Sequence, residues 1–230
     1  MREIVLDTET TGFEPAEGDR IVEIGAIELF NHLPTGRSYH QYINPERSMP
    51  AAAFEVHGLG DDFLRDKPVF AAIADEFIDF VGKDAKLVIH NASFDMKFLN
   101  AELGWAGRPL LPPDCAIDTV AMARRRFPGS PASLDALCRR FGIDNSRREK
   151  HGALLDSELL AEVYLQLIGG QQPDFGLTTT QGSSSAVSEP SWRPEPRTVR
   201  LFPRLTAEEK RAHEEFVAKL GENAIWRRFG

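Results

Sequence analysis

An aspartate lies on the apolar face of the helix that residues 152–168 predict. Four apolar residues follow Asp156 at helical spacing and share its side of that helix: Leu159, Leu160, Val163 and Leu167. A carboxylate on a buried face is costly unless a cation neutralises it or a metal binds it. Any fold of this chain must therefore bring a positive partner to Asp156.

Two other acidic positions extend this pattern. Asp95 shares a helix side with Phe98 and Leu99 if Ser93 begins that helix as its N-cap, and Asp7 and Glu9 leave the same face of the first strand. Each acid taken singly has an ordinary alternative: a polar strand end, a helix-dipole partner, or, for Asp156, an arginine partner. Together they predict a carboxylate cluster that repels itself unless cations bind, and ligands that are all oxygen favour Mg²⁺ or Mn²⁺.

A histidine precedes the last of these acids. His151 lies five residues before Asp156, a spacing that puts the two on different faces of one helix, so we expect His151 in the loop that enters the helix. There a neutral imidazole can act as a general base. The alternative is that His151 is an ordinary surface loop residue without a role in catalysis.

The fold class follows from the order of apolar patterns. Residues 4–6, 21–29 and 38–43 predict three strands of an antiparallel meander, and Leu87–Ile89 predicts a further buried strand. Helical spacing predicts helices at 70–81, 93–103, 118–127, 133–141 and 152–168. Strands followed by strands interleaved with helices predict an α/β fold with a mixed sheet.

The composition changes after Gly170. Residues 171–203 are rich in Pro, Ser, Thr and Gly and predict a flexible linker. Beyond them, Thr206 and Glu209 form a capping-box pattern ahead of a short amphipathic helix, whose apolar side we expect to bind a partner. We therefore predict three regions: a domain over 1–170, a linker over 171–203 and a binding segment over 204–230.

The sequence also limits where the chain works. It contains no apolar run of 18 residues and no secretory signal pattern, and its two cysteines are Cys115 and Cys138, so we expect a cytoplasmic protein. The formal charge of −8 disfavours bulk attraction to nucleic acid. However, residues 119–155 carry eight basic and three acidic residues, a local charge of +5. This basic segment could hold phosphates, or it could be a set of solvated helix faces.

Three motifs resemble a known family. DTETTG at Asp7–Gly12, HNASFDMKFL at His90–Leu99 and HGALLD at His151–Asp156 are similar to the exonuclease motifs of the DEDD superfamily, in its histidine-bearing branch. Three further stretches resemble the epsilon, or proofreading, subunits of bacterial DNA polymerase III: VHGL at Val56–Leu59, the stretch Leu134–Asp156, and AEVYLQL at Ala161–Leu167.

This resemblance implies a ribonuclease H-like fold and 3′–5′ hydrolysis of DNA that releases nucleoside monophosphates and proofreads replication. By motif position, two divalent cations would be held by Asp7, Glu9, Asp95 and Asp156, with His151 as the base. Thr10 and His57, along with Asp7 and Glu9, would lie near the terminal nucleotide.

The resemblance also implies partners. The single-stranded 3′ end of DNA would be the substrate, and the segment 204–230 would bind the catalytic alpha subunit of the polymerase. Gln172–Leu177 resembles, imperfectly, the peptides that bind the sliding clamp, with a plain linker as the alternative. Three other functions remain open: an RNA-trimming exonuclease of the same branch, a non-catalytic adaptor and a Mg²⁺-dependent phosphatase.

Overall fold

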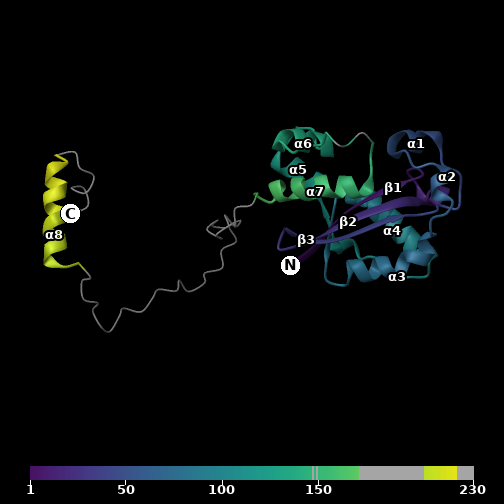
Figure 1. Ribbon diagram of the computed structural model, residues 1–230, viewed down its shortest axis with the longest axis horizontal. Coiled ribbons are helices and arrows are strands. Elements are labelled where there is room, and N and C mark those ends of the chain that lie inside the picture. Colours follow the sequence, from purple (N-terminus) through teal and green to yellow (C-terminus); the bar gives the residue numbers. More distant parts are fainter. Residues whose placement is uncertain (147, 149, 171–204, 222–230) are drawn as a thin grey trace, which may run out of the picture. The chain divides into compact units, whose positions relative to one another are not determined.

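A mixed sheet forms the centre of the larger part of the molecule. The computed structural model describes residues 1–146, 148, 150–170 and 205–221. Within these residues, five strands form one sheet in the order β3-β2-β1-β4-β5 (Figure 1). The strands are β1 (Arg2–Thr10), β2 (Ile21–Phe30), β3 (Leu33–Tyr42), β4 (Lys86–Ile89) and β5 (Ala116–Asp118). The β1–β2 and β2–β3 pairs are antiparallel and the β1–β4 and β4–β5 pairs are parallel, which confirms the mixed sheet and the meander.

Helices cover both faces of this sheet (Figure 1). Their bounds are α1 (Ala51–His57), α2 (Asp61–Leu64), α3 (Phe70–Val81), α4 (Ala92–Trp105), α5 (Thr119–Arg126), α6 (Leu134–Phe141) and α7 (Ala153–Leu167). Two 3₁₀ turns span Pro15–Glu17 and Pro113–Cys115. One apolar core lies between the sheet and α3 and α4, and a second lies between the sheet and α5, α6 and α7.

The alternation of side chains along β1 decides which face receives the acids. Ile4 and Leu6 belong to the core beneath α3 and α4, whereas Val5 belongs to the core beneath α7. Because successive side chains point to opposite faces, Asp7 and Glu9 share the face of Val5. The two acids therefore point toward the layer that contains α7.

Gly25 allows α7 to approach the sheet closely. A Cβ at this position would lie 2.2 Å from the Ala153 carbonyl carbon and from the Leu154 nitrogen. Gly25 pairs with Asp7 across β1 and β2, and its carbonyl accepts a 2.9 Å hydrogen bond from the Ser157 hydroxyl. The first turn of α7 is thus held beside Asp7.

Two further contacts fix the other end of α7. The Tyr164 hydroxyl donates a 2.6 Å hydrogen bond to the buried Glu3 carboxylate on β1. Arg126, at the end of α5, donates to the carbonyls of Gln166 and Leu167 at 2.7 and 2.6 Å, where the last carbonyls of a helix need donors. Both ends of α7 are therefore bound to the rest of the domain.

Most predicted elements are confirmed, and their differences have local causes. Helix α4 begins at Ala92, one residue before the predicted start. Its N-cap is Asn91, which takes a left-handed backbone (φ 67°) two residues after the end of β4, so the prediction of Ser93 as N-cap is wrong. Ser133 caps α6, and Gly82 follows the end of α3. The sequence analysis missed β5, which has three residues, and the short helices α1 and α2.

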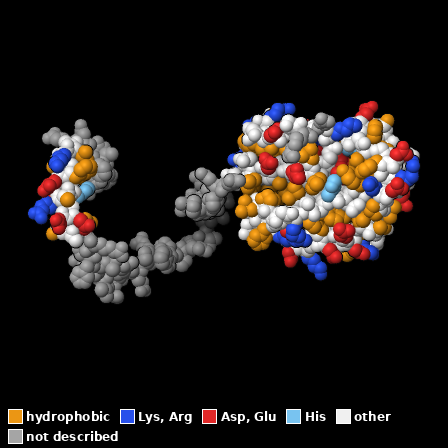
Figure 2. Space-filling view, viewed as in Figure 1, with side chains coloured by type: hydrophobic (Ala, Val, Ile, Leu, Met, Phe, Trp, Pro, Cys, Tyr) orange, Lys and Arg blue, Asp and Glu red, His pale blue; other side chains and the backbone are white. Residues whose placement is uncertain are grey.

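The C-terminal part is a separate unit. Contacts divide the chain into Met1–Thr178 and Thr179–Gly230, and in the second unit α8 (Ala207–Lys219) begins with the predicted capping box of Thr206 and Glu209. Apolar and charged side chains both lie on the surface of α8 (Figure 2), and Phe216 is 56% exposed. The predicted linker over 171–203 and the clamp-like Gln172–Leu177 lie outside the described residues, and the division into three regions stays a prediction.

No helix in the described part of the chain has the length and apolar character needed to cross a bilayer.

Replacing Gly25 with alanine tests the close approach of α7. The added methyl group would meet helix backbone, so we expect Gly25→Ala to lower the free energy of unfolding by about 1–3 kcal/mol or more in urea denaturation. Gly104→Ala is the matched control, because a Cβ there would be 3.7 Å from its nearest neighbour, and it should be neutral or stabilise by up to about 1 kcal/mol. Equal effects of the two substitutions would contradict the assignment of Gly25.

Candidate active site

Two carboxylates come from the end of β1. Asp7 and Glu9 lie opposite Gly25 and Glu23 of β2, and Glu9 is almost fully buried. Glu23 is also buried and accepts a 2.7 Å contact from His40 of β3. Since Glu9 and Glu23 are like charges on facing positions, Glu9 lies in a negative environment.

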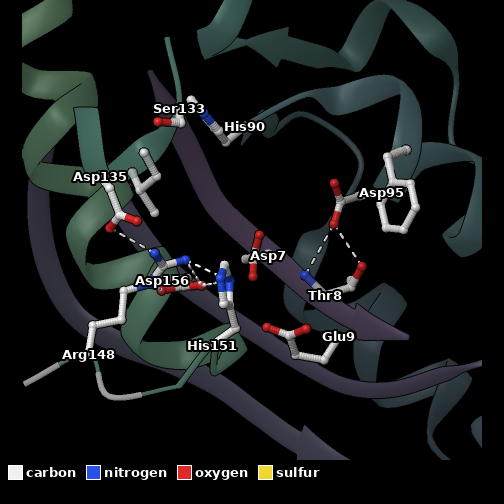
Figure 3. A pocket seen from close by; sticks show the side chains of 12 residues that line it. Asp7, Thr8, Glu9, His90, Asp95, Ser133, Asp135, Arg148, His151 and Asp156 are labelled. Carbon is white, nitrogen blue, oxygen red and sulfur yellow. Dashed lines mark hydrogen bonds and ion pairs between the residues drawn. The ribbon is translucent and has the colours of Figure 1, made fainter. Parts of the chain in front are cut away.

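The third carboxylate comes from the first turn of α4. Asp95 is 3% exposed, and its Oδ1 accepts hydrogen bonds from the Thr8 backbone nitrogen at 3.1 Å and from the Thr8 hydroxyl at 2.7 Å (Figure 3). Phe98 and Leu99, one turn further on, are fully buried, as the sequence pattern predicts. Thr8, between Asp7 and Glu9, thus links the two strand acids to the helix acid.

The fourth carboxylate comes from the first turn of α7, and an arginine holds it. Asp156 is 3% exposed, and it accepts hydrogen bonds from Arg148 Nε at 2.5 Å and Arg148 Nη2 at 2.7 Å. The arginine partner considered as an alternative for Asp156 is therefore present. His151 lies in the loop ahead of Gly152, as predicted, and its Nδ1 is 3.3 Å from Asp156 Oδ2.

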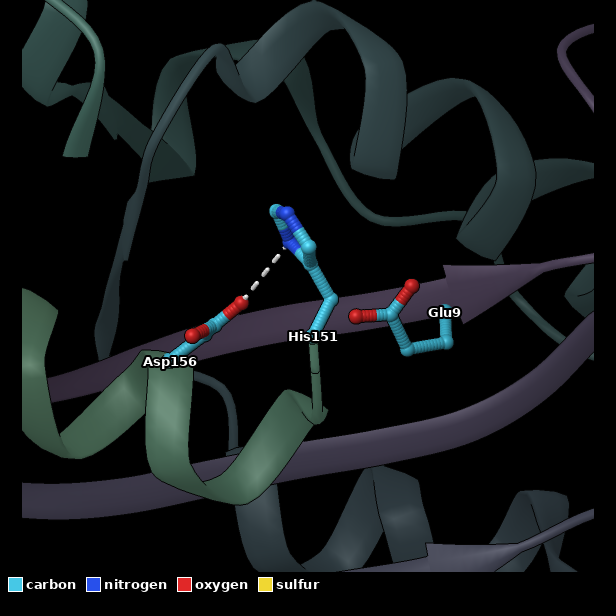
Figure 4. A group of neighbouring side chains, drawn as sticks. All are labelled: Glu9, His151 and Asp156. Carbon is cyan, nitrogen blue, oxygen red and sulfur yellow. Dashed lines mark ion pairs between the residues drawn. The ribbon is translucent and has the colours of Figure 1, made fainter. Parts of the chain in front are cut away.

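All four acids line one cavity. Its volume is about 290 Å³, and its walls come from β1, α4, the start of α6 and the loop before α7 (Figure 3). Its lining includes Asp7, Glu9, Asp95, His151 and Asp156. Glu9, His151 and Asp156 offer ligand atoms that lie within 4.8 Å of one another (Figure 4). The sequence thus identified residues that the fold brings together.

The electrostatics of this cavity favour a cation. Burial, followed by the neighbouring acids Asp95, Glu9 and Asp156, raises the pKa of Asp7 well above its usual value. Burial and the nearby Asp156 raise the pKa of Glu9 to about 8, and burial raises that of Asp95 to about 7 even though the Thr8 hydrogen bonds oppose it. Crowded carboxylates that resist ionisation release protons when a divalent cation binds.

Asp156 differs from the other three acids. Burial alone would raise its pKa, but the contacts with His151 and Arg148 outweigh burial and hold the pKa below its usual value. Asp156 is therefore ionised and already has a cationic partner, whereas Asp7, Glu9 and Asp95 have no cationic hydrogen-bond partner among the described residues.

Thr10 and His57 line a neighbouring apolar cavity of about 560 Å³. This second cavity shares Thr8, Glu9 and Phe94 with the first. His57 is buried, and its Nδ1 accepts a 3.0 Å hydrogen bond from the Leu59 backbone. Among the described residues, its Nε2 has no hydrogen-bond partner. Burial lowers the pKa of His57, and the nearby Thr10 backbone partly offsets this lowering.

Three polar residues that position the carboxylates were not predicted as site residues. Thr8 positions Asp95, Arg148 holds Asp156, and Asp135 accepts a 2.8 Å hydrogen bond from Arg148 Nη1. The requirement for a positive partner at Asp156 was the one available signal. This requirement did not indicate which arginine of the basic segment pairs with Asp156.

Three arginines of the basic segment make contacts within the domain. Arg126 is bound to the end of α7, Arg140 lies over the Phe127 ring at 4.4 Å, and Arg148 lies inside the cavity. Phosphate binding by the basic segment stays a prediction.

Comparisons with known proteins identify the family of the chain. The family model described as Exonuclease (RNase_T) matches residues 4–164, so the chain belongs to this exonuclease family. The DNA polymerase III subunit epsilon of Rickettsia felis is 50% identical over 229 residues, covering 97% of this chain and 99% of the relative. The protein of the same name from Escherichia coli K12 is 45% identical over 245 residues, covering 98% and 97%. Within the exonucleases, this chain belongs to the DNA polymerase III epsilon subunits.

Solved structures share the fold. The nuclease domain of 3′hExo, a DEDDh family member bound to rAMP, aligns with a TM-score of 0.62 at 20% identity, covering 73% of this chain and 91% of that one. Exonuclease X in complex with 5′ overhanging duplex DNA aligns with a TM-score of 0.55 at 23% identity, covering 72% and 90%. These likenesses confirm the ribonuclease H-like fold.

Substitution of Glu9 tests the charge balance. Because the pKa of Glu9 rises from 4.5 to about 8 on folding, its ionisation disfavours the folded state. The metal-free protein should lose stability as the pH rises from about 5 to 8. Glu9→Gln should reduce that loss by at least about 1 kcal/mol, the equivalent of one pKa unit. The measurement is urea denaturation in EDTA at several pH values.

Two controls accompany this measurement. Glu55→Gln changes an exposed glutamate and should leave the pH dependence unchanged. Mn²⁺ should remove most of the loss in the unmodified chain, since it compensates the ionised carboxylates. A Glu9→Gln variant with the original pH dependence would refute the buried-charge account.

Proposed function

We propose that this chain is a 3′–5′ exodeoxyribonuclease that proofreads replication as the epsilon subunit of a polymerase III core. The observation that carries the proposal is the convergence of Asp7, Glu9, Asp95 and Asp156 on one cavity beside His151. Hydrolysis of the last phosphodiester would release a nucleoside 5′-monophosphate and leave a shortened 3′ end.

The carboxylates fit a pair of divalent cations. All four supply oxygen ligands, which suits Mg²⁺ or Mn²⁺. Burial raises the pKa values of Asp7, Glu9 and Asp95, and neighbouring negative charges raise those of Asp7 and Glu9 further. Asp7, Glu9 and Asp156 would hold one cation, and Asp7 and Asp95 would hold the other, directly or through water. When bound, such cations stabilise the attacking and leaving oxygens of the displacement.

His151 supplies the base. Its side chain is 49% exposed at the edge of the cavity, within 3.3 Å of Asp156, so it can reach a water molecule next to the scissile phosphate. The imidazole takes the proton of the attacking water, and the adjacent carboxylate stabilises the imidazolium that forms. The proton then passes to solvent from this exposed ring.

The second cavity would hold the terminal nucleotide. Phe13 and Phe94 supply aromatic faces, with ring centroids 6.4 Å apart, and Thr10 and His57 supply polar groups. A base stacks on aromatic side chains without strong sequence preference, which suits an enzyme that must remove any mispaired nucleotide. The shared wall of Thr8 and Glu9 would place the terminal phosphodiester between the two cavities.

We assign exonuclease activity to residues 1–170 and binding of the polymerase alpha subunit to residues 204–230. The support for the second assignment is α8, whose Phe216 is 56% exposed, together with Leu220 at its C-cap, which is 46% exposed. Apolar side chains on an exposed helix are suited to a groove on a partner. The clamp-like Gln172–Leu177 is a further proposed contact within the linker.

Substitutions in the cavity should separate metal binding from proton transfer. Asp7→Asn should abolish excision of 3′-labelled single-stranded DNA and weaken Mn²⁺ binding, because Asp7 is proposed to contact both cations. His151→Gln should lower turnover at least about 100-fold while Mn²⁺ binding persists, because it removes only the base. Excision by Asp7→Asn at the original rate would refute the metal assignment.

Truncation tests the regional assignment. A chain that ends at Gly170 should retain excision of free DNA and lose binding to the alpha subunit, measured by surface plasmon resonance. Phe216→Ala in the full chain is the matched variant and should weaken alpha binding without changing excision. Undiminished alpha binding by the truncated chain would assign the contact to residues 1–170 instead.

The main alternative is an RNA-trimming enzyme with the same carboxylates. Rates on mismatched DNA ends and on short RNA separate the two activities. Membership in the polymerase III epsilon subunits favours DNA.

A further inference from the structure

Arg148 is a buried cation inside the cavity that we propose binds metal. Its side chain is 8% exposed, and all three of its guanidinium nitrogens are engaged (Figure 3). Nε and Nη2 bind the two oxygens of Asp156 at 2.5 and 2.7 Å, and Nη1 binds Asp135 at 2.8 Å. Nη2 also lies 2.7 Å from His151 Nδ1. One side chain thus contacts both an expected metal ligand and the expected base.

These contacts compete with a divalent cation. Both oxygens of Asp156 are hydrogen-bonded to Arg148, and His151 is close to one of them. A fork of two N–H groups on one carboxylate is among the stronger polar contacts in proteins. A divalent cation at Asp156 would have to share these oxygens with a positive charge less than 3 Å away, which is strongly repulsive in a buried setting.

Asp135 provides another place for the guanidinium. It lies in the first turn of α6, its side chain is 43% exposed, and Asn145 Nδ2 donates a 3.0 Å hydrogen bond to the same oxygen that binds Arg148. Arg148 itself lies in the loop between α6 and α7, so a change in its side chain requires no helix to move. The guanidinium can leave Asp156 and remain paired with Asp135.

We propose that Arg148 is a positioning residue that holds Asp156 and His151 until a divalent cation binds, and that it then releases both while staying on Asp135. The inference rests on the proposed function, because it takes Asp156 as a metal ligand. A guanidinium can only donate, so its contact occupies the lone pair of His151 Nδ1. Release of Arg148 therefore completes the metal site and frees the base in one event.

We expect substitutions of Arg148 and of Asp135 in the full chain to change metal affinity in opposite directions. Arg148→Gln and Arg148→Lys remove the two-pronged contact, so Mn²⁺ alone should bind about tenfold more tightly, as measured by isothermal titration calorimetry. Asp135→Asn removes the second partner of Arg148 and should weaken Mn²⁺ binding. If Arg148 had only a structural role, the Arg148 and Asp135 substitutions would not change Mn²⁺ affinity in opposite directions.

Two comparisons separate this mechanism from a simple charge effect. Arg148→Lys keeps the positive charge, so a charge effect alone would leave its Mn²⁺ affinity at the level of the unmodified chain. Lys150→Gln removes a charge two residues away, whose ammonium lies 5.2 Å from the Phe54 ring centroid, and should change affinity by at most about twofold. If Arg148→Lys binds Mn²⁺ as the unmodified chain does, or if Asp135→Asn tightens binding, the proposal is overturned.

A direct readout completes the test. The Arg148 Nε–H signal in ¹⁵N NMR should shift on addition of Mg²⁺ to the unmodified chain and should move far less in Asp156→Asn. A signal that does not move while Mg²⁺ binds would contradict the release of Arg148. Failure of the unmodified chain to bind any divalent cation would instead refute the proposed function.

Discussion

The absence of a side chain at Gly25 is the constraint on which the site depends. It lets the backbone of Ala153 and Leu154 lie against β2, directly opposite Asp7. A helix held one methyl group further away would carry Asp156 away from the strand acids. The Ser157 hydrogen bond to the Gly25 carbonyl and the Tyr164 hydrogen bond to Glu3 then fix the rotation of α7 about its axis. Backbone packing thus sets the distance between carboxylates that come from opposite ends of the domain sequence.

The resulting charge distribution is uneven. Among the described residues that line the cavity, Arg148 is the one lysine or arginine, and it hydrogen-bonds Asp156 and Asp135 rather than Asp7, Glu9 or Asp95. Glu23 adds a further negative charge behind Glu9. The cavity therefore has one side where a cation of the protein pairs with carboxylates, and another side where the acids have no such hydrogen-bonded partner. Thr8 contributes the only polar restraint on Asp95 from β1, through its backbone and its hydroxyl, among the contacts that the described residues make.

The sequence predicted what periodicity can reveal. Asp95 and Asp156 stood out because an acid interrupts an apolar stripe, and both are buried in the structure. The meander, β4 and the long helices were also predictable from apolar spacing. The left-handed backbone of Asn91 could not be predicted, because this helix start has no side-chain cap and so leaves no capping pattern in the sequence. The role of Arg148 could not be predicted, because a loop residue has no periodicity that fixes the direction of its side chain. The role of Gly25 could not be predicted either, because its close approach involves a helix that follows more than a hundred residues later. β5 was too short to carry a pattern.

The clamp of Arg126 on the last carbonyls of α7 has a mechanical consequence. A helix that is pulled from its C-terminal end unravels from that end, and α7 carries Asp156 in its first turn, at the other end. Since Arg126 ties the last carbonyls of α7 to α5, a force applied to the chain beyond Leu167 must break these two hydrogen bonds before it can unwind the helix. The turn of α7 that faces the carboxylates is therefore the last turn that such a force would reach.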